Sequence, residues 1–195
     1  MLNSCMGLYG TRSTYGSQSA AAVVNEAKVS MVVKPEGTRG GAYSFSAMVV
    51  GVGVANLDGP FRWRIEAEGI EGKHEAMFVQ NLRTETETTK RSEPYPRKWL
   101  GARVDFVKRK IDPPGVVKAV FNVPGLLQVK PKEDGPLNVF ADVIIVKQGK
   151  RERSVVKFRL DPTKKSDNQI LFIPAVIVKS FGKGPADWED DGWDR

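Results

Sequence analysis

Apolar and polar residues alternate along most of this chain, in short runs that turns separate. In the segment PFRWRIEAEG, Phe61, Trp63, Ile65 and Ala67 alternate with charged residues. A period of two residues is typical of a strand that is buried on one face only. We therefore expect a strand here, with its charged side chains directed to solvent.

The other runs are rich in Val, Ile and Phe, and Gly, Pro and Asp residues bound them. The sequences DPPG and KPKEDGP are typical of turns, and KQGKRE is typical of a hairpin connection. A helical period over ten residues is found nowhere. The segments expected to contain strands are 28–34, 42–56, 60–69, 74–89, 98–110, 116–125, 137–162 (two strands joined by the hairpin) and 168–182.

Strands without intervening helices predict an antiparallel β-sandwich, and we expect one that is similar to immunoglobulin or fibronectin type III domains. A closed β-barrel is the alternative. The cysteine pair of antibody domains is missing, because Cys5 is the only cysteine. We expect a flexible arm or tether at 1–25, one sandwich domain at 26–184 and an acidic tail that contains tryptophan at 185–195.

The net charge of +7 is unevenly distributed. Residues 187–195 hold five acidic residues and one Arg, so the remainder has 29 basic residues against 18 acidic ones, a net charge of +11. A basic body favours an anionic partner. Nucleic acid, an anionic cell-envelope polymer, an anionic lipid surface and the chain's own tail are the candidates.

Residues that could support catalysis are few. His74 is the only histidine, and we expect it at an edge or on the surface of the sheet. Glu66 and Glu68 fall on the solvent side of their strand. Too few His and Cys residues are present for a zinc site. We therefore expect a non-enzymatic protein with no catalytic residues, no metal and no cofactor.

The sequence LNSC at the start resembles the lipobox of bacterial lipoproteins. Leu2 lies three places before Cys5, with Asn3 and Ser4 between them. The resemblance implies cleavage before Cys5, a diacylglycerol group on its sulfur and a lipid anchor at a bacterial cell envelope, without a transmembrane helix. The alternative is that Cys5 is an incidental thiol in a flexible arm. In that case we expect the protein in the cytoplasm or bound in an assembly.

Basic residues cluster in two parts of the sequence. Cations next to aromatic rings suit an anionic polymer or another anionic partner, although no nucleic-acid-binding motif accompanies them. The first cluster contains the candidates Arg97, Lys98, Trp99, Arg103, Lys108, Arg109 and Lys110. The second surrounds the expected hairpin and contains Lys147, Lys150, Arg151, Arg153, Lys157 and Arg159.

The tail is the third candidate site. Trp188 and Trp193 are unusual in so acidic a segment, and Asp190 and Asp191 could meet a basic patch. If that patch belongs to another copy of the chain, the tail is an assembly contact. An intramolecular clasp is equally compatible with the sequence.

These features favour a non-enzymatic binding or scaffolding sandwich of a bacterial cell envelope, lipid-anchored through Cys5. A self-assembling structural subunit of a capsid, sheath or filament is the first alternative, with the arm and the tail as subunit contacts. A polyanion-binding or nucleic-acid-binding module is the second. Association with a protein partner or with itself is expected in the first two cases.

Overall fold

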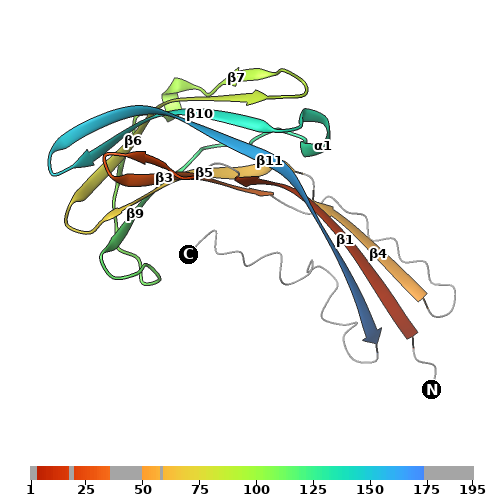
Figure 1. Cartoon of the computed structure of the whole chain (residues 1–195). Helices are drawn as coiled ribbons and strands as arrows, with labels where there is room; N and C mark the ends of the chain where they lie inside the picture. The colour runs from red at the N-terminus through yellow and green to blue at the C-terminus, as the bar shows by residue number, and fades with distance from the viewer. Residues whose placement is uncertain (1–3, 18–19, 36–49, 58, 174–195) are drawn as a thin grey trace.

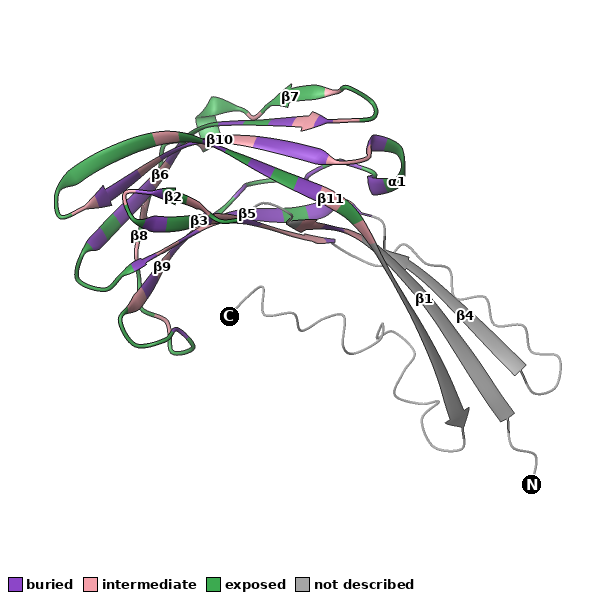
Figure 2. Cartoon of the chain, viewed as in Figure 1, coloured by how far each residue is buried: buried purple, intermediate pink, exposed green. Residues whose placement is uncertain are grey.

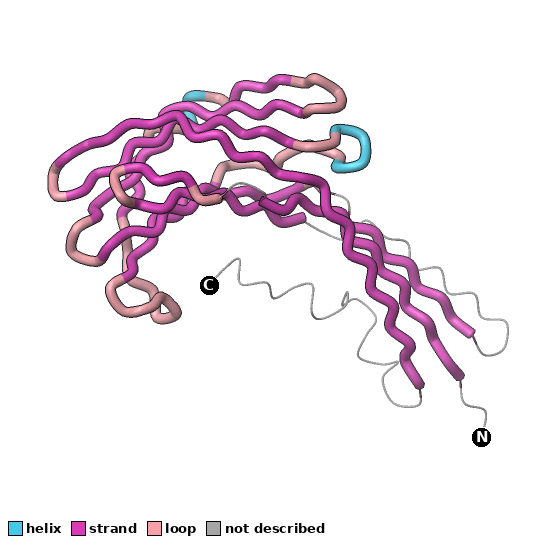
Figure 3. Tube along the Cα trace, in the orientation of Figure 1, coloured by secondary structure: helices cyan, strands magenta, loops and turns pink. Residues whose placement is uncertain are grey.

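The structure is a computed structural model and consists almost entirely of strands (Figures 1 and 3). The residues whose backbone it describes are 4–17, 20–35, 50–57 and 59–173. The residues whose side chains it describes are 14–16, 20–35 and 59–163.

The smaller sheet has four antiparallel strands in the order β2-β3-β5-β9. Its central strand β5 carries the alternating segment found in the sequence. Phe61, Trp63, Ile65 and Ala67 are all at most 4% exposed, as the pattern predicts. The four strands are β2 (Ala22–Val24), β3 (Ala27–Pro35), β5 (Phe61–Ile70) and β9 (Val116–Asn122).

The larger sheet has seven strands in the order β4-β1-β11-β10-β6-β7, and β8 pairs with β6 as well. Two short helices lie in the connections: η1 (Arg97–Trp99) between β7 and β8, and α1 (Pro131–Asp134) between β9 of the smaller sheet and β10 of the larger one. The strands are β1 (Ser4–Ser17), β4 (Val50–Leu57), β6 (His74–Thr86), β7 (Ser92–Pro94), β8 (Arg103–Asp105), β10 (Leu137–Lys147) and β11 (Lys150–Ile173).

The two sheets form an open sandwich and do not close into a barrel, so the predicted sandwich is confirmed. β5 lies between β3 and β9, while β10 lies between β6 and β11. This order matches the A-B-E and C-F-G strands of immunoglobulin-like sandwiches. The core between the sheets is apolar because both inner faces bury alternate residues of their strands.

β10 and β11 form the hairpin that the sequence predicts. Gln148 and Gly149 connect them, both with positive φ (48° and 74°), as a type I′ turn requires. Along β11, Val156, Phe158 and Leu160 are buried, and the residues between them are exposed. Figure 2 shows this alternation as buried and exposed bands along the strand.

Beyond Leu160, β11 leaves the sandwich and pairs with β1, which in turn pairs with β4 (Figure 1). The strand β1 is antiparallel to β11 and parallel to β4. These three strands project from the sandwich as a ribbon. At the base of the ribbon the buried ring of Tyr15 contacts the ring of Phe61 edge-on, with centroids 5.6 Å apart.

The structure differs from the predictions near the N-terminus and in the last strand. We expected no strand before residue 26, yet β1 and β2 lie there. Pairing with β11 explains β1, because backbone hydrogen bonds form without any apolar alternation. We also expected a strand at 168–182 separate from the hairpin, whereas β11 continues unbroken to Ile173. The rest of that segment, with Pro174, lies outside the described residues.

The inward side of β11 holds the large sheet to the core. Phe158 is 1% exposed, and replacing a buried Phe by Ala costs about 3–5 kcal/mol of unfolding free energy. We expect Phe158→Ala to lower stability by this amount in urea unfolding. Val155→Ala is the matched control, because Val155 is 69% exposed on the same strand. Equal effects of the two substitutions would contradict the assigned faces of β11.

Candidate binding surface

The outward side of β11 carries the second basic cluster. A strand directs alternate residues to the same face, and the buried positions of β11 are the even-numbered ones between Val156 and Leu160. The odd-numbered residues therefore share the outer face of the large sheet. They are Arg151, Arg153, Val155, Lys157 and Arg159, and all five are exposed.

The neighbouring strands place aromatic rings beside these cations. Phe140 of β10 lies directly opposite Lys157 of β11 on one side and Arg83 of β6 on the other. Residues that are directly opposite in an antiparallel pair lie on the same face. The Arg83 guanidinium carbon is 4.7 Å from the centroid of the Phe140 ring, and the Lys157 Nζ is 5.5 Å from it.

A second row repeats this arrangement nearer the hairpin. Ile144 of β10 lies between Phe78 of β6 and Arg153 of β11. The guanidinium carbon of Arg151 is 5.7 Å from the centroid of the Phe78 ring. We call the surface formed by these rows the basic-aromatic face. It consists of Phe78, Arg83, Phe140, Ile144, Arg151, Arg153, Val155, Lys157 and Arg159.

A carboxylate lies between the two rows. Asp142 of β10 is buried, and Arg153 donates from Nε to Oδ1 (2.8 Å) and from Nη2 to Oδ2 (2.5 Å). These hydrogen bonds from Arg153 are the main cause that holds the pKa of Asp142 below its usual range, and they outweigh the opposing effect of burial. Asp142 therefore stays ionised and fixes the position of Arg153.

The cations of the basic-aromatic face differ in their partners. Arg159 donates from Nη1 to Glu87 Oε1 at 2.5 Å, so its charge is largely compensated. Among the described residues, no carboxylate lies within salt-bridge distance of Arg151 or Lys157, whose ring contacts are with Phe78 and Phe140. Arg151 and Lys157 are thus the cations of this face that are best placed for an outside anion.

The first basic cluster does not form one surface. β7 pairs with β6 at Arg83–Glu85, whereas β8 pairs with β6 at Ala76–Phe78. The segment between β7 and β9 therefore runs along the edge of the large sheet. Its candidates lie in different places along it: Arg97, Lys98 and Trp99 in η1, Arg103 in β8, and Lys108, Arg109 and Lys110 in the loop before β9.

Internal contacts occupy several of these candidates. Arg103 Nε is 2.6 Å from Asp105 Oδ1, and Arg109 Nη2 is 3.1 Å from Asp112 Oδ1. Lys108 donates to the carbonyl oxygens of the loop, including that of Val116 at 3.0 Å.

Trp99 is the exposed aromatic residue of this segment. It is 49% exposed, and the Lys98 Nζ is 5.1 Å from its ring centroid. Lys110 is exposed as well. Lys98 and Trp99 lie in η1, whereas Lys110 lies in the loop before β9, and their role in binding a partner stays a prediction.

The N-terminal and C-terminal candidates are only partly placed. The backbone of Cys5 pairs with Phe172 of β11 and with Val50 of β4, and its side chain lies outside the described residues. Trp188, Asp190, Asp191 and Trp193 lie outside them entirely. Lipidation of Cys5 and the role of the tail therefore stay predictions.

His74 is buried, which corrects the expected edge or surface position. Its Nδ1 accepts from the backbone N–H of Ile70 at 2.8 Å, so its Nε2 carries the proton and donates to the carbonyl oxygen of Asn25 at 2.9 Å. A Cβ on Gly69 would lie 2.6 Å from the His74 ring, so only glycine fits beside it. Both ring nitrogens are occupied, and His74 fastens the start of β6.

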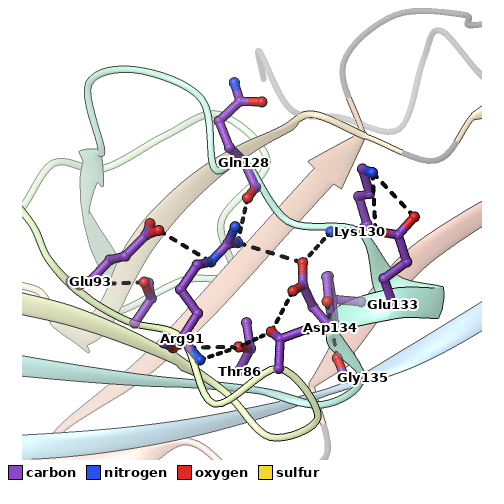
Figure 4. Close-up of polar contacts among 11 residues, drawn as sticks. Thr86, Arg91, Glu93, Gln128, Lys130, Glu133, Asp134 and Gly135 are labelled. Carbon is purple, nitrogen blue, oxygen red and sulfur yellow. Dashed lines mark hydrogen bonds and ion pairs between the residues drawn. The ribbon is translucent and has the colours of Figure 1, made fainter.

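A second polar cluster lies at the end of the sandwich near α1 (Figure 4). Asp134 is buried and accepts from the Thr89 hydroxyl at 2.7 Å and from the Lys130 backbone N–H at 2.7 Å. Arg91 lies 3.5 Å from the same carboxylate and donates to the carbonyl oxygen of Gln128 at 2.6 Å. Because these bonds join the β6–β7 turn to α1, the cluster closes this end of the sandwich.

Within the part of the chain that the structure describes, no three His, Cys, Asp or Glu side chains are grouped as a metal site would require. No helix in that part is long and apolar enough to span a membrane.

The sequence alone could not identify Phe78, Arg83, Phe140 and Ile144 as neighbours of the second basic cluster. These residues lie on β6 and β10, and only the strand register brings them beside β11. One sequence feature does indicate this surface. Four cations alternate along an expected strand and therefore share one of its faces: Arg151, Arg153, Lys157 and Arg159.

Comparison with known protein families, curated proteins and solved structures finds no match to this chain.

The pair Asp142–Arg153 predicts a dependence of stability on pH. The folded state lowers the pKa of Asp142, so its contribution to stability is present above the unfolded pKa of about 4 and is lost as the pH falls through the folded pKa. We expect Asp142→Asn to lower the urea midpoint at pH 7, and we expect this difference to shrink below about pH 4. A difference that stays constant down to pH 2 would contradict this assignment.

Proposed function

We propose that this chain is a non-enzymatic binding module that binds an anionic partner on the basic-aromatic face. The observation that carries the proposal is the position of Arg151 and Lys157. Both are exposed on one face of β11, each lies over a phenylalanine ring, and neither has a carboxylate partner among the described residues.

The shape and charge of the face support this role. Cations over aromatic rings neutralise an anion while the rings and aliphatic stems offer apolar contact area. The net charge of the chain without residues 187–195 is +11, which attracts an anionic partner over a longer range. The strands β6, β10 and β11 are hydrogen-bonded side by side in the large sheet, so the positions of these residues are organised before binding.

The outer face of the small sheet also carries cations, and acidic residues compensate some of them. On β5, Arg64 lies 2.5 Å from Glu66, and Glu68 lies 3.6 Å from Lys118 of β9. Lys28 of β3 is exposed on the same face. The proposal therefore rests on the ring contacts of Arg151 and Lys157 and not on positive charge alone.

A position at a bacterial cell envelope with a lipid anchor on Cys5 is part of the same proposal. Its support is the LNSC sequence, and an anionic envelope polymer would be a suitable ligand for the basic-aromatic face. Intact mass of the protein from its source cell tests the anchor, since a diacylated Cys5 at the N-terminus is expected and an unmodified Met1 would contradict it.

Heparin chromatography tests the binding surface. We expect the full chain to bind heparin, and we expect Arg151→Glu/Lys157→Glu to elute at a lower salt concentration. Each lost cation lowers the slope of log affinity against log salt by about 1, so the double variant loses about 2. Thermal unfolding checks that the variant is folded.

Two matched variants control for charge alone. Lys28→Glu/Lys90→Glu makes the same charge change at exposed positions outside the face. We expect this variant to elute at the same salt concentration as the wild-type chain. Lys98→Glu/Lys110→Glu tests the first basic cluster. Loss of binding in this last variant, with normal binding of Arg151→Glu/Lys157→Glu, would overturn the proposed surface.

A further inference from the structure

We propose that the partner of the basic-aromatic face is the acidic segment 187–195 of a second copy of this chain. This inference rests on the proposed role of the face in binding an anion and names its occupant. It makes the protein a self-associating subunit, in which each copy offers one face and one acidic segment.

Charge complementarity is the first argument. Segment 187–195 carries five acidic residues and one Arg, a net charge of −4. On the face, Arg151 and Lys157 have no carboxylate partner among the described residues, while Glu85, Asp142 and Glu87 already compensate Arg83, Arg153 and Arg159. A segment of this charge supplies the anions that the two remaining cations lack.

The apolar residues of the segment fit the same face. Val155 is 69% exposed between Arg153 and Lys157, and Phe140 and Ile144 lie partly exposed on the neighbouring strand. A tryptophan in an acidic segment gains contact area on such a surface while its carboxylates stay near the cations. In an extended chain Trp188 and Asp190 are on one side, about 6.8 Å apart, which is the spacing of Val155 and Lys157 along β11.

The length of the chain favours a second copy over the same copy. β11 runs through Ile173, so Lys157 lies 16 residues back along the strand, about 53 Å at 3.3 Å per residue. Trp188 follows Ile173 by 15 residues, which span at most about 54 Å when fully extended. In its own copy, Trp188 could therefore reach Lys157 along β11 only with almost no slack, at a high cost in conformational entropy, although the acidic residues that follow Trp188 have a longer reach. A second copy removes this requirement.

Contacts of this kind join two different surfaces, so they are head-to-tail and lead to chains or rings. We expect the full chain to run above the monomer mass in size-exclusion chromatography with light scattering. The face variant Arg151→Glu/Lys157→Glu and the segment variant Trp188→Ala/Asp190→Asn/Asp191→Asn should each be monomeric, with the dissociation constant raised at least about tenfold.

Mixing the two variants is the decisive experiment. The face variant keeps an intact acidic segment, and the segment variant keeps an intact face, so one contact can form between them. We expect a heterodimer with one copy of each variant and no larger species. Lys28→Glu/Lys90→Glu, the control with the same charge change, should keep the mass of the wild-type chain.

The possible results separate the two proposals. A mixture that stays monomeric, or a full chain that is monomeric, overturns the second-copy inference. If the full chain is monomeric and the face variant alone loses heparin binding, the proposed function stands and only the second-copy inference fails. If even the segment variant, whose face is free, is not retained on heparin, the proposed function is overturned.

Discussion

The alternation of side chains along β11 is the constraint on which the rest of this structure depends. Val156, Phe158 and Leu160 must face the core to hold the large sheet against the small one. Because successive side chains of a strand point to opposite faces, burial of these residues forces the cations between them outward. A shift of the register by one residue would bury Lys157 and Arg159. The core thus determines where the charges of the candidate surface lie.

The outer face is stabilised by its own contacts as well. Asp142 lies in the middle of β10 and binds Arg153 through both carboxylate oxygens, which keeps one cation in place without exposing a free acid. The rings of Phe78 and Phe140 lie beneath Arg151 and Lys157. The same strands therefore build an apolar core on one side and an ordered basic surface on the other, which is the physical basis of the proposed binding role.

The sequence predicted the sandwich because the alternation in Phe61–Ala67 and the turn residues are local signals. Its failures have physical reasons too. β1 has no apolar alternation to detect, and it is ordered by pairing with β11. The cluster Arg97–Lys110 is compact in sequence but extends along the edge of a sheet, whereas Phe140 and Lys157 become neighbours only through the register of β10 and β11. No local sequence pattern predicts contacts between strands that are distant in the sequence.

Cysteine scanning along β11 tests this account most directly. In the segment variant Trp188→Ala/Asp190→Asn/Asp191→Asn with Cys5→Ser, whose outer face is not covered by a second copy, single cysteines replace residues 155–160 in turn, and their rates of reaction with a water-soluble maleimide are measured on the folded protein. The account predicts alternation, with fast reaction at Val155→Cys and protection at Val156→Cys and Phe158→Cys. Uniform reactivity, or protection at the odd-numbered positions, would contradict it.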